Sequence, residues 1–168
     1  AALAPYEARQ AHTAQRLMAK KLGWLGVEDG DDASIAALFG LLAQQSVDHT
    51  AFFWRLADAL GDDSAAVREL FVQPQAFDAW ASPWRARALS QGQTVATAQA
   101  QMRQHNPAVV LRNHLGQQAI ERAERGDWSE VHRLQTALAK PFEVLPGCED
   151  FCEVAPDWAS TIAISCSS

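Results

Sequence analysis

The sequence predicts an all-α protein of about seven to eight helices that ends in an extended C-terminal tail. Apolar residues recur at helical spacing through most of the first 140 residues. Pro, Asp and Asn stand where these helices would begin, and Gly stands where several would end. After Lys140 the chain carries three prolines and little helical period. We therefore expect a helical domain over 1–140 and an extended tail over 141–168.

Three helices are expected in the N-terminal part of the chain. Pro5 suits the first turn of the first helix, and Gly23 is expected to end it. Asp48 is expected to cap the third helix and Gly61 to break it. Short loops between the helices favour antiparallel neighbours. The predicted ranges are 5–23, 33–46 and 47–63.

Five further helices are expected before the tail. Pro83 lies inside the second of them and is expected to kink or split it near Ser82. The pair Asn106 and Pro107 fits a cap followed by a first-turn proline, which would start a long helix. The predicted ranges are 64–71, 74–92, 94–105, 107–126 and 128–139.

The last of these helices has an expected cap of its own. Asp127 precedes it, and Glu130 lies three residues later in the position of a capping box. Beyond it the tail is expected to wrap over the helices as an extended segment, anchored by its large apolar residues. Those anchors are Phe142, Phe151, Trp158 and Ile162.

Charge and length exclude some function classes. The net charge of −6 argues against a general nucleic-acid binder, because phosphate contacts need a basic surface. No apolar run reaches the ~20 residues of a membrane span. Residues 76–125 carry a local charge of +3 and residues 140–168 a local charge of −4. Either the acidic tail lies along the arginine-bearing helices, or both faces are merely solvated.

Motifs for catalysis or metal binding are missing from the sequence. It has no glycine-rich phosphate loop, and its five histidines are scattered and expected at the surface or half-buried. Cys148 and Cys152 are spaced by one helical turn, but they lack a second pair and are expected to be small apolar fillers. Three cysteines, all after position 147, favour a reducing, cytoplasmic compartment over a secreted disulfide framework. Cys166, two residues before the C-terminus, is either a leftover thiol on a frayed end or a thiol placed to reach a partner.

Several stretches, in order, resemble the C-terminal part of the SelO/YdiU family, the selenoprotein O pseudokinases. The combination of an NP-x-x-V-x-R-N motif, an A-I-x-x-A-x-x-G-D motif and a terminal cysteine carries most of the resemblance. Pro83 departs from the unbroken helix expected of the family. The matching stretches are KLG at 21–23, QAFDAW at 75–80, NPAVVLRNH at 106–114, QAIERAERGDW at 118–128, KPFEVLP at 140–146, PDW at 156–158 and SCSS at 165–168.

The resemblance implies that the intact protein has a protein-kinase-like fold and transfers AMP from ATP to Ser, Thr or Tyr side chains of proteins, with Mg or Mn. The catalytic, nucleotide-binding and metal-binding residues would lie in a kinase-like core upstream of Ala1. The intact protein would be bacterial and cytoplasmic. This chain would be a C-terminal extension of the large lobe of that core. No cofactor, metal, nucleic acid or membrane is expected to bind this chain. Its partners would be that core and protein substrates.

The resemblance also assigns expected roles to residues present in this chain. Family members end in a selenocysteine or a cysteine, and Cys166 matches the cysteine form. It would form a redox-sensitive disulfide with a cysteine of the upstream core, which requires Cα atoms within about 7 Å. The motif residues Asn106, Pro107, Arg112 and Asn113 are expected to be structural.

A second hypothesis is a self-contained α-helical module that binds other proteins through a groove between helices. An exposed apolar patch containing Trp24, Trp80 or Trp84 would favour it. Sequence upstream of Ala1 that encodes a kinase-like core would favour the first hypothesis.

Overall fold

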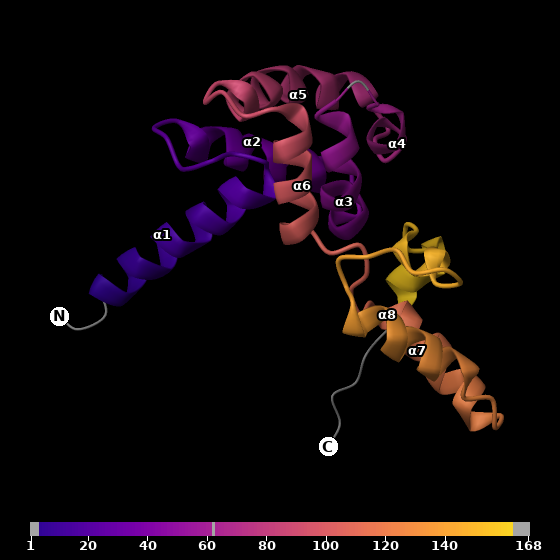
Figure 1. Cartoon of the computed structure of the whole chain (residues 1–168). Helices are drawn as coiled ribbons and strands as arrows, with labels where there is room; N and C mark the ends of the chain where they lie inside the picture. Colours follow the sequence, from indigo (N-terminus) through magenta and orange to yellow (C-terminus); the bar gives the residue numbers. More distant parts are fainter. Residues whose placement is uncertain (1–3, 62, 163–168) are drawn as a thin grey trace. The chain divides into compact units, whose positions relative to one another are not determined.

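The computed structural model describes residues 4–61 and 63–162, and these divide into two compact units, 1–106 and 107–168. The described residues form eight α-helices, two 3₁₀ helices and no strand, which confirms the all-α prediction (Figure 1). None of these helices combines the length and the apolar character needed to cross a membrane. The division falls at Asn106, whereas the sequence prediction placed the boundary at residue 140.

The N-terminal unit contains six of the helices, packed around one apolar core. Its helices are α1 (Ala4–Lys21), α2 (Asp31–Gln44), α3 (His49–Ala59), α4 (Ala65–Arg68), α5 (Pro74–Leu89) and α6 (Val95–His105).

Aromatic rings form the centre of this core. Phe52 contacts the rings of Phe71 and Phe77 edge-on, with centroids 5.9 and 6.3 Å away. Trp80 and Trp84 stack with centroids 5.5 Å apart, and Trp84 is fully buried. Such pairs contribute about 0.5–1.5 kcal/mol beyond the burial of their area. The core is therefore held chiefly by large apolar side chains.

Two predicted helix ends are confirmed in this unit. The carboxylate of Asp48 accepts a hydrogen bond from the Ala51 N–H at 3.0 Å, as an N-cap does. Gly23 follows α1 with a φ of +75°, and a side chain there would press against Met102. Both features favour glycine at that position.

The helix α5 runs through Pro83 as one helix, so of the predicted kink or split near Ser82 the split is wrong. Pro83 removes the hydrogen bond that its N–H would donate to the Ala79 carbonyl. Both residues are exposed. Water can therefore solvate the carbonyl that the proline leaves unpaired.

The C-terminal unit contains a helical hairpin followed by two short 3₁₀ helices. Its elements are α7 (Asn113–Glu124), α8 (Ser129–Ala139), η1 (Glu149–Cys152) and η2 (Asp157–Thr161).

The helix predicted to start at Pro107 starts instead at Asn113, and residues 107–112 are not helical. The N–H groups of Ala108 and Val109 both donate to the Pro141 carbonyl, at 2.8 and 3.1 Å. This contact with a residue far along the chain fixes the backbone in an extended path.

The predicted tail anchors behave differently from one another. Phe151 is buried, as predicted, and Ile162 is half-buried. Phe142 and Trp158 are exposed by 45% and 44%, and Trp158 nevertheless contacts the His114 ring of the same unit. The tail is also partly 3₁₀-helical and not extended throughout.

Candidate functional site

Cys166, the predicted redox residue, lies outside the described residues. The last described residue is Ile162, which follows η2. The candidate site is therefore the part of the C-terminal unit that holds the segment leading toward Cys166.

Arg112 binds this segment from the N-terminal end of α7. Its Nη2 donates to the backbone carbonyls of Phe151 and Glu153, at 2.8 and 2.5 Å. A guanidinium is planar and carries several donors, so it can hold two carbonyl oxygens at once. Arg112 was predicted to be structural, and these two hydrogen bonds show what it holds. Asn113, the next residue of the motif, is the exposed first residue of α7.

Arg133, on α8, binds the same segment from a second helix. Its Nε and Nη2 donate to the Gly147 carbonyl at 2.9 and 2.7 Å, and Nη2 also reaches Asp150 at 2.5 Å. The guanidinium lies over the Phe151 ring, 4.7 Å from its centroid. We call Arg112, Arg133 and the segment 147–153 the arginine clasp.

A buried carboxylate orients Arg133. Glu130 is only 3% exposed and contacts Arg133 Nη1 at 2.8 Å and Arg122 Nη1 at 3.3 Å. Burial lowers the pKa of Arg133, but hydrogen bonds to Glu130 and Asp150 outweigh it, so the pKa stands above its ordinary value. The guanidinium is therefore charged at any physiological pH.

Glu130 therefore does not complete the predicted capping box. The Asp127 N–H that it would bind donates instead to the Arg122 carbonyl at 3.0 Å. Asp127 does bind the next turn, accepting from the Ser129 N–H at 3.0 Å. Hydrogen bonds from the Ser129 side chain and, to a smaller extent, from its backbone N–H lower the pKa of the Asp127 carboxyl.

The two described cysteines lie inside the clasp region. Cys148 is buried, with Sγ 3.8 Å from the Arg133 carbonyl, and Cys152 is half-buried. Burial raises the pKa of the Cys152 thiol, and the charge of Glu153 raises it further. A raised pKa disfavours the reactive thiolate. Cys148 thus fills apolar space, as predicted.

Asn106 and Pro107 do not begin a helix but follow the end of α6. Asn106 is 1% exposed, its backbone N–H donates to Met102, and its Nδ2 donates to the Lys21 carbonyl at 2.8 Å. Lys21 in turn donates to the His105 carbonyl and lies over the Phe53 ring. Burial lowers the pKa of Lys21. Asn106 is a C-cap that joins α6 to the end of α1.

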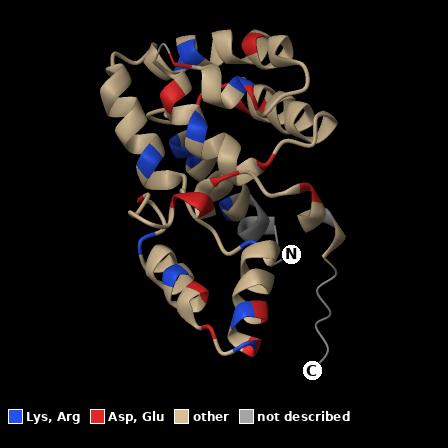
Figure 2. Ribbon diagram, turned by 90° about the vertical axis from the view of Figure 1, so that its right-hand side faces the viewer, with Lys and Arg blue, Asp and Glu red and all other residues tan. Residues whose placement is uncertain are grey.

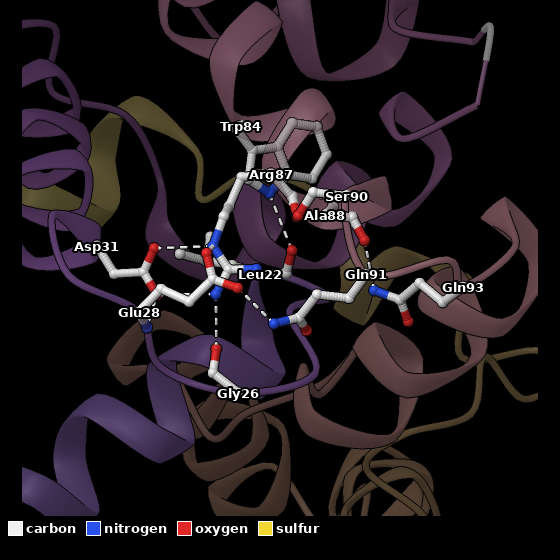
Figure 3. A network of polar contacts seen from close by, with 10 residues as sticks. All are labelled: Leu22, Gly26, Glu28, Asp31, Trp84, Arg87, Ala88, Ser90, Gln91 and Gln93. Atoms are coloured by element: carbon white, nitrogen blue, oxygen red, sulfur yellow. Dashed lines mark hydrogen bonds and ion pairs between the residues drawn. The ribbon is translucent and has the colours of Figure 1, made fainter.

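One polar cluster was missed by the sequence reasoning. Arg87, on α5, contacts the buried Asp31 at 3.0 Å and donates to the Gly26 carbonyl at 2.9 Å (Figure 3). It also contacts Glu28, which receives a hydrogen bond from Gln91. The sequence indicated only that Asp31 could cap a helix. Its contact with Arg87 could not be predicted, because the two residues are 56 positions apart in the chain. The cluster fixes the loop between α1 and α2.

The arginines of residues 76–125 mostly bind partners other than the acidic tail. Arg87 and Arg103 pair with Asp31 and Asp58, and Arg122 pairs with Glu130. Arg112 does reach the tail, where it binds the carbonyl oxygens of Phe151 and Glu153. Figure 2 accordingly shows Lys and Arg interspersed with Asp and Glu over the described helices.

The histidines and acids of the described residues form no group of three that could hold a metal ion. His114 is buried, whereas a surface or half-buried position was expected, and the Trp158 ring lies edge-on to it with centroids 6.0 Å apart. Among the described residues, the contacts of the arginine clasp hold the segment 147–153 against α7 and α8.

Comparison with known proteins places this chain in a family. The family described as "Protein adenylyltransferase SelO" matches residues 1–139. A "Protein nucleotidyltransferase YdiU" from Myxococcus xanthus (strain DK1622) is 43% identical over 172 residues, which cover 100% of this chain and 35% of the relative. A protein of the same name from Stutzerimonas stutzeri (strain A1501) is 41% identical over 153 residues, covering 90% of this chain and 32% of the relative. The chain spans about a third of the length of the curated relatives it matches.

Proposed function

Because the chain belongs to the protein adenylyltransferase SelO family, we propose that it is the C-terminal region of a longer bacterial enzyme that transfers AMP from ATP to Ser, Thr or Tyr side chains of proteins. The observation that carries the proposal is the family match over residues 1–139. The length of the relatives supports the further step that most of the enzyme lies outside this chain.

In this proposal the chemistry takes place in a kinase-like core that precedes Ala1 in the cytoplasmic enzyme. That core would hold ATP and Mg or Mn. In this proposal the chain itself takes part in no catalytic step.

The contribution of this chain would be packing and redox control. Cys166 would form a disulfide with a cysteine of the core and so link activity to redox state. The arginine clasp supports this proposal because it fixes residues 147–153, the part of the tail that leads toward Cys166. Cys166 is four positions after Ile162, so their Cα atoms are at most about 14 Å apart in an extended chain. The Cα of the partner cysteine would have to lie within about 7 Å of a point inside that reach.

The proposal is tested with the intact protein and ATP labelled at the α-phosphate. We expect the label to transfer to protein with divalent metal, and a mass-spectrometric disulfide map to pair Cys166 with an upstream cysteine after oxidation. Cys166→Ser should abolish the redox response and keep the transfer. Tight Mg-dependent ATP binding by residues 1–168 alone would contradict the proposal, as would Cys166 remaining reduced under every oxidising condition.

A self-contained protein-binding module remains the second candidate. The exposed apolar side chains of the C-terminal unit favour it, with Leu111, Trp128 and Ile120 between 55% and 61% exposed. Trp24, Trp80 and Trp84 are all buried, so none of them forms the exposed apolar patch that would have favoured this module. The reading frame before Ala1 separates the two candidates. A kinase-like core encoded there would rule out the module as the primary function.

A further inference from the structure

The helix α2 is apolar on both of its sides. Leu38 and Leu42 are fully buried in the core of the N-terminal unit. Gly40 is two residues from each of them, and because two residues turn an α-helix by about 200°, Gly40 points away from the core. The exposed residues of α2 between positions 33 and 43 are all alanine, phenylalanine or glycine. They are Ala33, Ala36, Ala37, Phe39, Gly40 and Ala43.

A helix with this pattern is normally covered on both sides. Surface helices carry charged or polar residues on the face opposite the core, whereas helices that are apolar all round are buried. Among the described residues of the N-terminal unit, the core covers only the inner side of α2, where the Ser34 carbonyl accepts a hydrogen bond from Trp80 of α5 at 3.1 Å. The outer side of α2 therefore has the composition of a packed surface.

Gly40 is a separate indication of a packing partner. Glycine inside a helix lowers the stability of the helix relative to alanine, because the unfolded chain gains conformational freedom. The backbone of Gly40 is helical, and a Cβ added there would meet no atom of the described residues within 4 Å. Neither the backbone nor a neighbour in this unit thus requires a glycine. Glycine does suit a position that another segment approaches closely.

The outer side of α2 ends at a hollow of about 460 Å³. Gln44, one turn after Gly40, lines this hollow together with residues of the turn after α2 and of the start of α5. Val72 also lines it and is 83% exposed, more than any other large apolar side chain among the described residues. A partner that packs on α2 and inserts an apolar side chain into the hollow would cover Val72 as well.

We propose that a helix of the part of the intact protein that precedes Ala1 packs on the outer side of α2 and fills this hollow. The inference rests on the proposed function, in which that part is the kinase-like core. Small side chains allow two helix axes to approach closely, which favours a helix as the partner. We call the five small residues within about 60° of Gly40 around the helix the α2 face. They are Ala33, Ala36, Ala37, Gly40 and Ala43.

Two observations favour an occupant from the same polypeptide. The relatives are about three times as long as this chain. In the proposed enzyme most of the polypeptide is therefore tethered to α2, at a high effective concentration. The α2 face also carries no charged residue. Surfaces that stay permanently covered are more apolar than those of transient complexes.

The test measures whether the α2 face is covered in the intact protein. Ala36→Cys places a thiol on this face, one turn before Gly40. Ala100→Cys is the matched control on α6, where Ala100 is exposed between the exposed polar residues Thr97 and Gln104. Each variant is treated with iodoacetamide with and without urea, and the modified peptide is quantified by mass spectrometry. We expect folding to slow modification of the Ala36→Cys thiol at least roughly tenfold, and that of the control thiol much less.

A second substitution shows whether a partner causes the protection. Gly40→Glu places its side chain in space that the described residues of this chain leave free, so α2 itself should still fold. The added charge cannot be buried beneath a packed helix without a large cost in free energy. In the double variant Ala36→Cys/Gly40→Glu, we expect the thiol to be modified about as fast as that of the control.

Three outcomes would overturn the proposal. The first is modification of the Ala36→Cys thiol in the native protein as fast as that of the Ala100→Cys thiol. The second is protection that Gly40→Glu leaves unchanged. The third is protection that is lost on dilution to a monomer, because the occupant would then be a second copy.

The proposed activity and this packing can fail independently. Loss of AMP transfer with a protected Ala36→Cys thiol would remove the proposed activity and keep the packing. AMP transfer with rapid modification of that thiol would do the reverse.

Discussion

The two units of this chain are stabilised in different ways. The N-terminal unit buries a continuous cluster of large aromatic and aliphatic side chains that includes Phe52, Phe77 and Trp84. The C-terminal unit buries few large apolar residues, among them Leu134 and Phe151, and relies on guanidinium groups bound to carbonyls and carboxylates. Apolar packing tolerates many sequences of similar volume. The polar contacts require particular atoms at particular places, so single conservative substitutions should distinguish the two units.

The largest effect is expected in the aromatic core. Trp84→Ala removes a fully buried ring, its stacking on Trp80 and its hydrogen bond to the Leu22 carbonyl. We expect a loss of about 3–5 kcal/mol in the free energy of unfolding, measured by urea denaturation. Trp128→Ala is the control, since Trp128 is 58% exposed. Equal losses for both variants would break the comparison between the units.

The next effect is expected at the buried carboxylate of the C-terminal unit. Glu130→Gln keeps the shape of the side chain but removes the charge that pairs with Arg122 and Arg133. We expect the free energy of unfolding to fall by about 2 kcal/mol, because hydrogen bonds to charged groups exceed neutral ones. Glu124→Gln, at an exposed position of α7, should change little. A stability unaffected by Glu130→Gln would show that the buried charge is dispensable.

A smaller and local effect is expected for the clasp. Arg112→Lys keeps the charge but replaces a planar donor group with one ammonium, which cannot match the geometry of the two carbonyls. We expect the free energy of unfolding to fall by about 1–2 kcal/mol. Hydrogen exchange should become faster over residues 147–162 and stay unchanged in the N-terminal unit. Arg125→Lys, at an exposed site, is the control. Faster exchange throughout residues 4–106 would contradict the independence of the units.

The smallest effect concerns pH. The pKa of the Cys152 thiol is raised by burial and by Glu153 above its ordinary value of 9.0, so the folded protein disfavours its thiolate. The neutral thiol therefore contributes to the stability of the folded protein below pH 9.0. This contribution is lost as the pH rises through the higher pKa that the thiol has in the folded state. We expect iodoacetamide to alkylate Cys152 more slowly at pH 8.5 than a cysteine of the urea-unfolded chain. Equal rates, followed by peptide mass spectrometry, would contradict the raised pKa.

Local signals in the sequence predicted most helices, and contacts distant in sequence account for most errors. Asp48 and Gly23 act within a few residues of themselves, so their roles could be predicted. Asn106 could not be assigned, since an Asn-Pro pair suits the end of one helix as well as the start of another. The choice depends on Lys21 and Pro141, which lie far away in the chain. Glu130 likewise has the spacing of a capping box, but it pairs with Arg133 on its own helix and with Arg122, which only the folded hairpin brings to it.

The candidate site was predictable in part for the same reason. The motif indicated Arg112, but not that it binds the carbonyls of Phe151 and Glu153. Arg133 belongs to no motif identified in the sequence, and only the proximity of the segment 147–153 gives it a role. The prediction for Cys166 stays untested, since that residue lies outside the described part of the chain.

The double hydrogen bond to the Pro141 carbonyl makes the helical hairpin a closed loop in the chain. The backbone enters beside Pro141 and, after α7 and α8, returns to the same oxygen. A change in the length of the hairpin at its exposed Gly126 turn therefore leaves the entry and exit points where they are. Relatives could accordingly insert or delete residues at this turn without shifting the tail, which makes it the position where a tag or a probe would disturb the rest of the protein least.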